Sequence, residues 1–324
     1  MYNQSELRDI VDKTLINLAF NKQTTGLYDP VKYILSIGGK RIRPVMTLMA
    51  CNLFTDNISD AIMPAAGMEV FHNFTLVHDD IMDKSVVRRG FPTVHTKWDT
   101  NQAILSGDVM AFIANECFLQ TSETNMIKVF RVFNKAAIEV CIGQQMDMEY
   151  EKAAVLSQDE YLEMIEMKTA VLMAASMKIG ALVGGGNDKD SSLLYEFGKN
   201  IGLAFQIQDD LLDIWGDTKV FGKKPGGDIV ANKKTFPFIK AFEKASGETL
   251  KQLQTLFSTD YPDQETKVSH VTSIYDMLNI RQTTEKLANN YIDKAFAILQ
   301  EVNVDNSRKK ELTGLASSLI LRDR

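Results

Sequence analysis

Two acidic triplets are the residues of this sequence best suited to bind a metal ion. They share the spacing Asp-Asp-x-x-Asp and comprise Asp79, Asp80 and Asp83, and Asp209, Asp210 and Asp213. On a helix, the first and last aspartates of such a triplet lie one turn apart on the same face. Three crowded carboxylates repel one another and favour a hard divalent cation that prefers oxygen ligands, above all Mg²⁺.

An acidic triplet can also be part of an ordinary solvated helix face. If the sequence contained only one triplet, that explanation would be favoured. About one chain in seven of this composition would contain one triplet by chance, but only about one in a hundred would contain two. Apolar pairs flank both triplets, with Leu76-Val77 and Ile81-Met82 around the first and Leu211-Leu212 within the second. Because buried carboxylates without a counter-charge are costly, the pattern favours two metal-binding clusters that face the protein interior.

Cationic residues in or beside glycine-containing loops supply a second kind of group. They are Lys40 and Arg43, Arg88 and Arg89, and Lys223 and Lys233. Arginine binds phosphate oxygens in pairs and lysine acts as a point charge, while Mg²⁺ is commonly shared between carboxylates and substrate phosphates. Any one of these side chains could be an ordinary surface cation, but together they predict a diphosphate bound through several Mg²⁺ ions. No Gly-x-x-x-x-Gly-Lys-Ser/Thr motif is present, which argues against a P-loop nucleotidase.

Helices must position these groups, because apolar residues recur at three- and four-residue spacing through most of the chain. Glycine and proline are sparse, with 19 and 7 residues, and no alternating strand pattern is evident. We expect helices at about 5–20, 31–36, 41–54, 63–83, 101–119, 125–150, 158–183, 191–215, 234–243, 247–257, 268–299 and 307–320. The predicted fold class is all-α, as a single domain over residues 1–324. The alternative is two helical subdomains that meet near Gly184-Gly185-Gly186.

Composition places the chain among ordinary globular proteins. Its 324 residues are 45% hydrophobic, and 36 Lys and Arg against 42 Asp and Glu give a net charge of −6. This acidic balance argues against a nucleic-acid partner. The apolar stretch from Thr169 to Val183 contains Lys178 and is too short for a transmembrane segment. A polar N-terminus and three dispersed cysteines, which we expect to be buried, predict a cytoplasmic protein.

Taken in order along the chain, these motifs resemble the signatures of the trans-isoprenyl diphosphate synthases, also called polyprenyl synthetases. The matching segments are Gly-Gly-Lys-Arg-Ile-Arg-Pro at 38–44, Asp-Asp-Ile-Met-Asp at 79–83, Arg88-Arg89-Gly90, Lys168-Thr169, Phe205-Gln206-Ile207-Gln208-Asp209-Asp210-Leu211-Leu212-Asp213, Gly222-Lys223, Asn232-Lys233-Lys234-Thr235 and Arg322-Asp323-Arg324. The resemblance spans essentially the whole chain. It implies the isoprenoid-synthase helical bundle around a deep central cavity, with the two aspartate motifs facing each other across its mouth.

The resemblance also implies an activity and a role for each residue. The expected reaction condenses isopentenyl diphosphate with an allylic diphosphate by ionisation, condensation and elimination. The implied ligands of three Mg²⁺ ions are Asp79, Asp83 and Asp209, with Asp80 and Asp213 as supporting ligands. The implied contacts of isopentenyl diphosphate are Lys40, Arg43, His72 and Arg89, and those of the allylic diphosphate are Arg88, Lys168, Lys223 and Lys233. The groups placed to stabilise the allylic cation are Lys168, Thr169 and Gln206.

For two of these residues, His72 and Phe74, the sequence also allows a purely structural role. His72 lies seven residues before Asp79 and hence on nearly the same helical face, but it could be a hydrogen-bonded core histidine. Phe74, with Phe71 and Thr75 nearby, lies where a growing prenyl chain would pass, and a large ring there would act as a floor. This favours a farnesyl or geranylgeranyl product over a longer polyprenyl chain, unless Phe74 only packs the core.

Other classes of protein share parts of this pattern. A terpene cyclase would not need Lys40, Arg43 and Arg89 for a second diphosphate, and a non-catalytic subunit typically loses aspartates from one motif. This chain keeps all six aspartates, which favours a chain-elongating enzyme. The resemblance further implies a homodimer, although the sequence identifies neither its interface nor the preferred allylic primer.

Overall fold

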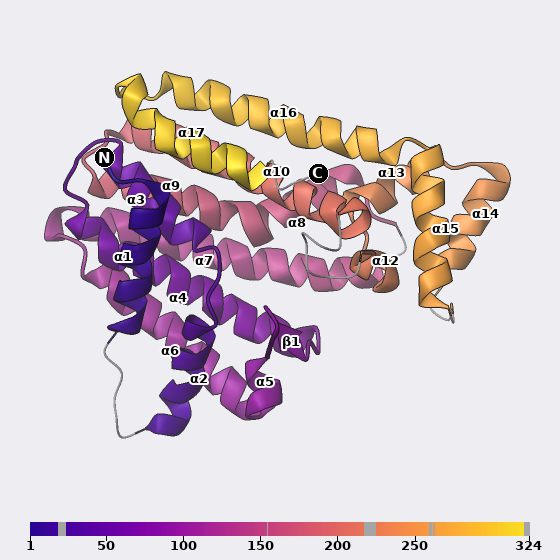
Figure 1. The fold of residues 1–324 in the computed structure, drawn as a ribbon, viewed down its shortest axis with the longest axis horizontal. Coiled ribbons are helices and arrows are strands. Elements are labelled where there is room, and N and C mark those ends of the chain that lie inside the picture. Colours follow the sequence, from indigo (N-terminus) through magenta and orange to yellow (C-terminus); the bar gives the residue numbers. More distant parts are fainter. Residues whose placement is uncertain (19–23, 154, 217–224, 259–260, 262, 321–324) are drawn as a thin grey trace. The chain divides into compact units, whose positions relative to one another are not determined.

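The computed structural model describes residues 1–18, 24–153, 155–216, 225–258, 261 and 263–320, most of which are helical (Figure 1). The helices are α1 (Gln4–Ile16), α2 (Thr25–Ser36), α3 (Ile42–Asn52), α4 (Ser59–Met82), α5 (Val94–Lys97), α6 (Thr100–Leu119), α7 (Glu123–Lys152), α8 (Gln158–Ile165), α9 (Val171–Val183), α10 (Asp188–Trp215), α12 (Gly227–Val230), α13 (Phe236–Lys244), α14 (Gly247–Leu256), α15 (Gln264–Met277), α16 (Ile280–Glu301) and α17 (Asn306–Ile320). A π-helical segment, η1 (Glu166–Ala170), joins α8 to α9. The all-α prediction is confirmed.

The described chain separates into two compact units, each built from three segments. Unit 1 comprises Met1–Lys135, Ala175–Tyr195 and Val302–Leu312, and unit 2 comprises Ala136–Ala174, Glu196–Glu301 and Thr313–Arg324. The helices α7, α9, α10 and α17 contribute residues to both units. Gly184-Gly185-Gly186 lies inside a segment of unit 1, so the units do not divide at this glycine cluster. The single domain over residues 1–324 stays a prediction.

In unit 1, the long helix α4 carries the first aspartate triplet at its C-terminal end. It begins at Ser59, four residues before the predicted start, so Pro64 lies inside the helix rather than in its first turn. Small buried residues allow close packing, and a Cβ at Gly67 would lie 3.0 Å from side-chain atoms of Cys117 and Phe118 on α6. This tight contact fixes the helix that also presents His72 and Phe74.

In unit 2, two glycines allow backbones to approach closely around η1. A Cβ at Gly143 of α7 would lie 2.2 Å from the backbone nitrogen of Lys168, and a Cβ at Gly202 of α10 would lie 2.6 Å from the Cα atom of Ala170. Only glycine leaves enough room for such contacts. The two close approaches therefore hold Lys168 and Thr169 of η1 against α7 and α10.

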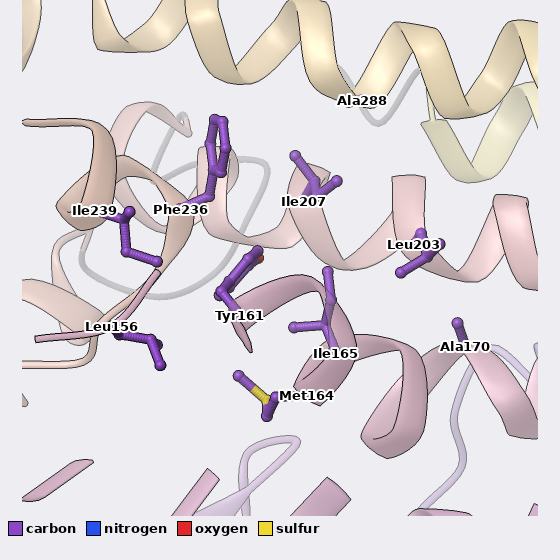
Figure 2. Close-up of a cluster of buried hydrophobic side chains, with 10 residues drawn as sticks. All are labelled: Leu156, Tyr161, Met164, Ile165, Ala170, Leu203, Ile207, Phe236, Ile239 and Ala288. Atoms are coloured by element: carbon purple, nitrogen blue, oxygen red, sulfur yellow. The ribbon is translucent and has the colours of Figure 1, made fainter. Parts of the chain in front are cut away.

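Apolar side chains behind η1 complete this arrangement (Figure 2). The buried cluster consists of Leu156, Tyr161, Met164, Ile165, Ala170, Leu203, Ile207, Phe236, Ile239 and Ala288. These residues come from α8, η1, α10, α13 and α16 and from the segment before α8. Fully burying a large apolar side chain contributes about 1.5–3 kcal/mol, so the cluster supplies a rigid support for η1 and the middle of α10.

Three local features differ from the predicted elements. The predicted helix at 158–183 contains the π-helical turn η1, and the predicted helix at 268–299 is split into α15 and α16, with Asn279 in the left-handed region at φ 54°. Asparagine tolerates this conformation better than most residues. Strands β1 (Val87–Arg88) and β2 (Phe91–Pro92) form an unpredicted antiparallel hairpin, whose turn residues Arg89 and Gly90 both have positive φ, as tight hairpin turns require.

Two further expectations concern cysteines and membrane segments. Cys51 and Cys117 are buried, but Cys141 is exposed on α7, so the prediction that all three are buried is wrong for Cys141. Among the helices of the described residues, none combines the length and hydropathy that crossing a membrane requires.

Candidate functional site

The first aspartate triplet lies at the C-terminal end of α4, and helical geometry directs Asp80 to a different face from Asp79 and Asp83. Asp80 is buried and forms a salt bridge with Arg88, whose Nε atom lies 2.9 Å from each carboxylate oxygen. Asp79 is half-buried and Asp83, at the C-cap of α4, is exposed. The structure thus distinguishes Asp80, which orients Arg88, from Asp79 and Asp83, which lie one turn apart.

The hairpin that follows α4 positions the paired arginines in unit 1. Arg88 lies on β1, whereas Arg89 lies in the turn, with φ 54°. The Arg89 guanidinium donates a hydrogen bond to the carbonyl oxygen of Gly38. The hairpin and the loop before α3 therefore meet, and this contact brings Arg89 to the segment that contains the exposed Lys40.

Arg43 and His72 form the centre of a cationic cluster. Arg43 Nη1 lies 3.2 Å from His72 Nε2, and because a guanidinium only donates, Nε2 accepts and the imidazole proton resides on Nδ1. Burial, followed by the charges of Arg43 and three other arginines, lowers the pKa of His72 well below 6.5. Burial and the charge of Arg89 also lower the pKa of Arg43 to about 10, against the opposing effect of Glu69. His72 is therefore neutral and polar in a positively charged surrounding.

One buried donor of this cluster is not satisfied by the described residues. Within the described residues, the Nε atom of Arg43 is buried and has no hydrogen-bond partner. A buried, unsatisfied donor on a charged group costs more than a typical neutral one. In contrast, Arg41 donates to Asp12 at 2.9 Å, to Glu69 at 2.8 Å and to the carbonyl oxygen of Leu35 at 2.7 Å. Arg41 is thus satisfied within the fold, whereas Arg43 retains a donor for a ligand.

The second aspartate triplet lies in the last turns of α10, in unit 2. Asp210 is buried and accepts hydrogen bonds from the Tyr161 hydroxyl at 2.5 Å and from Gln206 Nε2 at 3.1 Å. Burial and the nearby charge of Asp228 raise the pKa of Asp210 to about 8. Asp209 and Asp213 are half-buried. The middle aspartate is thus held inside the fold, while its neighbours flank it one residue before and one turn after.

Asp228 adds a carboxylate to the second triplet that the sequence analysis does not identify. Its backbone N–H donates to Asp213 Oδ2 at 2.9 Å, which places it at the N-terminal end of α12. Burial and the charge of Asp213 raise its pKa to about 6, against the opposing charge of Lys233. The only sequence signal is its place directly after Gly226-Gly227, because Asp228 repeats no spacing of the triplets.

A cavity of about 110 Å³ in unit 2 brings together the residues predicted to stabilise an allylic cation. It is lined by Asp147, Tyr150, Glu151, Leu156, Tyr161, Met164, Ile165, Lys168, Thr169, Gln206, Asp210, Asp228, Lys233, Lys234 and Thr235. The Thr169 hydroxyl donates to Gln206 Oε1 at 3.1 Å, and Lys168 Nζ donates to Asp147 at 2.6 Å. Lys168, Thr169, Gln206 and Lys233 therefore share one cavity with two acidic residues that sequence reasoning missed, Asp147 and Asp228.

Asp147 and Tyr161 show why these functional candidates escape detection in the sequence. Asp147 lies four residues after Gly143 on α7, so the glycine that contacts Lys168 also brings Asp147 to the Lys168 side chain. Tyr161 is a single aromatic residue on α8 that resembles any core residue until its hydroxyl is seen on Asp210. Both are recognised only through contacts with another helix.

The residues predicted to form a chain-length floor lie in an aromatic cluster of unit 1. The ring centroids of Phe71 and Phe74 are 5.4 Å apart, and Phe71 also contacts Phe133 of α7 at 5.2 Å. Phe74 is half-buried and contacts the ring of His78 at 4.9 Å. The Thr75 hydroxyl donates to the carbonyl oxygen of His72, so Thr75 is engaged with its own helix. Phe74 and Phe71 are therefore held by other rings.

In the described part of the chain, no three histidine, cysteine or acidic side chains are arranged to hold a metal ion by themselves. This suits Mg²⁺, which usually keeps waters and completes its shell with substrate phosphates. Lys223 and the terminal Arg322-Asp323-Arg324 lie outside the described residues. That the two triplets face each other stays a prediction.

Comparison with known proteins identifies the family. The model of the polyprenyl synthetase family matches residues 24–277. The chain is 42% identical over 220 residues to a geranylgeranyl diphosphate synthase of Methanosarcina mazei, covering 67% of this chain and 68% of that one. It is 37% identical to a geranylgeranyl pyrophosphate synthase of Geoglobus acetivorans, covering 97% and 96%. A crystal structure of a geranylgeranyl pyrophosphate synthase, 38% identical, matches with a TM-score of 0.95 over 100% of both chains. The chain belongs to the polyprenyl synthetase family, the trans-isoprenyl diphosphate synthases.

Proposed function

We propose that this enzyme makes farnesyl or geranylgeranyl diphosphate, with Mg²⁺ bound by Asp79, Asp83 and Asp209. Prenyl chain elongation from isopentenyl diphosphate and an allylic diphosphate is the activity of its family. The observation that carries the assignment of the site is the cavity of unit 2, which Thr169, Gln206, the buried Asp210 and the half-buried Asp228 line together.

The acidic cluster at the end of α10 suits a cation bound together with a diphosphate. Burial raises the pKa values of Asp210 and Asp228, so a cation beside them would favour their charged forms. When bound, Mg²⁺ would neutralise the charge that develops on the leaving diphosphate. Asp213, which accepts the Asp228 N–H, would support the ligand Asp209 rather than compete with it, and Asp80 would do the same for Asp79 through Arg88.

Thr169 and Gln206 would stabilise the allylic cation without capturing it. Both present oxygen atoms in the cavity, and each is held by a hydrogen bond to the other. Fixed dipoles stabilise a developing charge without having to reorient during the reaction. The ammonium group of Lys168 donates a hydrogen bond to Asp147, which positions it in the cavity. From there it would bind a diphosphate oxygen, and the backbone carbonyl of Lys168 would stabilise the cation.

The cationic cluster of unit 1 would bind isopentenyl diphosphate. Arg43 offers a buried donor without a partner in the described residues, and neutral His72 can donate through Nδ1. Lys40 and Arg89 extend the positive charge around them, because Arg89 is anchored on the adjoining loop. This cluster also argues against the terpene cyclase alternative, which needs no second diphosphate.

An exposed apolar stripe on α6 supports a homodimer. Leu105, Phe112 and Leu119 recur every seven residues and expose 55%, 68% and 47% of their surface. Side chains at this spacing lie on one helical face, and contiguous exposed apolar surface marks interaction sites. We propose that a second copy of the chain covers this stripe.

The elongation activity is tested with Mg²⁺, isopentenyl diphosphate and a series of allylic diphosphates, with products identified by mass spectrometry. We expect elongated diphosphates that disappear when EDTA removes the metal, and a decrease on the order of a hundred-fold in kcat for Asp79→Ala. A cyclic hydrocarbon product would indicate a terpene cyclase. Absence of any product with every primer would indicate a non-catalytic subunit.

The chain-length floor is tested by Phe74→Ala. Because removal of the ring opens space beside the aspartate triplet, we expect products longer than those of the wild type, again measured by mass. Phe242→Ala, which truncates a half-buried ring of another aromatic cluster, serves as the control and should leave product length unchanged. Identical products from wild type and Phe74→Ala would show that Phe74 only packs the core.

The neutral state of His72 predicts a pH dependence of stability. An unfolded histidine titrates near pH 6.5, whereas in the fold the pKa of His72 is well below that value. The unfolded chain therefore binds this proton first, so the contribution of His72 to stability is full above about pH 6.5 and is lost as the pH falls. We expect the unfolding free energy, measured with urea at pH 7 and pH 5, to decrease less in His72→Gln than in wild type. His270→Gln, at an exposed histidine, is the control, and an equal decrease in all three proteins would contradict the assignment.

The dimer interface is tested by Phe112→Asp. We expect wild-type protein to sediment at twice the 36.4 kDa mass of one chain and the variant to sediment as a monomer. Val155→Asp changes an apolar residue that is 83% exposed outside α6 and should remain dimeric. A dimeric Phe112→Asp protein would place the interface elsewhere.

A further inference from the structure

We propose that Tyr161 is a positioning residue that acts through Asp210 to fix the orientation of the Gln206 amide. In this arrangement the carbonyl oxygen of Gln206, rather than its NH₂ group, points toward Thr169 and the cation. The inference rests on the proposed role of Gln206 and Thr169 in prenyl transfer. It also gives a function to Asp210, the one aspartate of the two triplets to which the sequence analysis assigns none.

The proposal follows from a continuous chain of hydrogen bonds in unit 2. The Tyr161 hydroxyl lies 2.5 Å from Asp210 Oδ2, and Gln206 Nε2 lies 3.1 Å from Asp210 Oδ1. Thr169 Oγ1 lies 3.1 Å from Gln206 Oε1. All four side chains line the same cavity, so the chain leads from the apolar cluster to the surface that would face the substrate.

The direction of each hydrogen bond follows from the groups involved. The phenol O–H of Tyr161 and the NH₂ group of Gln206 are the donors, so the two oxygen atoms of Asp210 accept one hydrogen bond from each. The carbonyl oxygen of Gln206 then faces Thr169 and accepts its hydroxyl proton. Because that proton is used, Thr169 presents oxygen lone pairs to the cavity. The negative ends of both dipoles are therefore directed at the place where positive charge would develop.

Without this anchor the amide could adopt either orientation. The nitrogen and oxygen atoms of a glutamine amide have almost the same shape, and only hydrogen bonding distinguishes the two orientations. A reversed Gln206 amide would present its NH₂ group, the positive end of its dipole, beside the cation. Asp210 prevents this reversal only as long as its own carboxylate is held in place.

The hydroxyl group of Tyr161 is suited to hold Asp210, whereas its ring serves to fill the apolar cluster. The side chain is 1% exposed and packs in the apolar cluster of Figure 2, where phenylalanine would fill the same space. A buried tyrosine hydroxyl requires a hydrogen-bond partner. At 2.5 Å from Asp210 Oδ2, the hydroxyl makes a short hydrogen bond that restrains the carboxyl group.

The proposal is tested by Tyr161→Phe, with kcat and KM measured for both substrates in the presence of Mg²⁺. We expect kcat to fall about ten- to a hundred-fold. Both KM values should stay within about twofold of wild type, since Tyr161 is not among the residues proposed to bind either diphosphate. Tyr275→Phe removes a hydroxyl from another fully buried tyrosine of unit 2 and should retain wild-type kcat. Unchanged kcat in Tyr161→Phe, or an increase in KM alone, would overturn the proposal.

A double-mutant cycle separates positioning from a general structural effect. If Tyr161 acts through Gln206, then Tyr161→Phe should produce no further loss of kcat in a Gln206→Leu background. Independent, multiplying losses would overturn the proposal. If Gln206→Leu itself retains wild-type kcat, the proposed role of Gln206 fails, and an inactive wild type would refute the proposed function instead.

A second variant tests the same orientation if Tyr161→Phe does not fold. In Asp210→Asn the carboxamide can accept the Tyr161 proton and offer its NH₂ group to Gln206, which would turn the Gln206 carbonyl away from Thr169. We expect kcat to fall at least as much as in Tyr161→Phe, with the Mg²⁺ concentration for half-maximal activity within about twofold of wild type. A retained kcat, or a loss that added Mg²⁺ restores, would contradict the orientation mechanism.

Discussion

Acidic side chains at the C-terminal ends of two long helices are the constraint on which the rest of the site depends. Asp79 and Asp83 lie in the last turn and at the C-cap of α4, and Asp209 and Asp213 lie in the last turns of α10. The C-terminal end of a helix carries partial negative charge, so carboxylates are unfavourable there even before they repel one another. Burial adds to this cost at Asp210, whose pKa is raised to about 8. A cation shared with a diphosphate would offset all three effects at once, and such binding would account for the acidic residues clustered at the end of each helix.

Two arginines of unit 1, Arg41 and Arg43, place positive charge inside the fold, and the protein supplies carboxylate partners for Arg41. Arg41, in the left-handed conformation before α3, is buried and forms salt bridges with the buried Glu69 and the half-buried Asp12. Arg43, two residues later, donates to neutral His72, and its buried Nε atom has no partner within the described residues. The two arginines thus differ because the protein neutralises Arg41 with two carboxylates, whereas Arg43 keeps a donor without a partner in the described residues.

The parts of the site that could be predicted from the sequence are those with a repeated spacing. The aspartate triplets and the long helices α4 and α10 follow from local periodicity, because helical geometry fixes which residues share a face. The π-helical turn η1 does not follow, since it depends on close approaches at Gly143 and Gly202 from helices distant in sequence. Asp147 and Asp228 were missed for the same reason. Each is a single acidic residue whose neighbours are set by tertiary packing, and a single acid has no spacing to detect.

A net charge of −6 spread evenly over the surface would disfavour anionic substrates, but this total averages over two local fields of opposite sign. At physiological ionic strength, interactions between exposed charges are largely screened beyond about 8 Å. A diphosphate near Arg43 and Arg89 therefore experiences those arginines and their immediate neighbours, while surface carboxylates elsewhere on the chain contribute little. The acids of α10 act on a similarly short scale, where they would attract a divalent cation that in turn would attract phosphate. An acidic protein can thus bind two anionic substrates, because the sign of a binding site is set by the charges within one screening length of it.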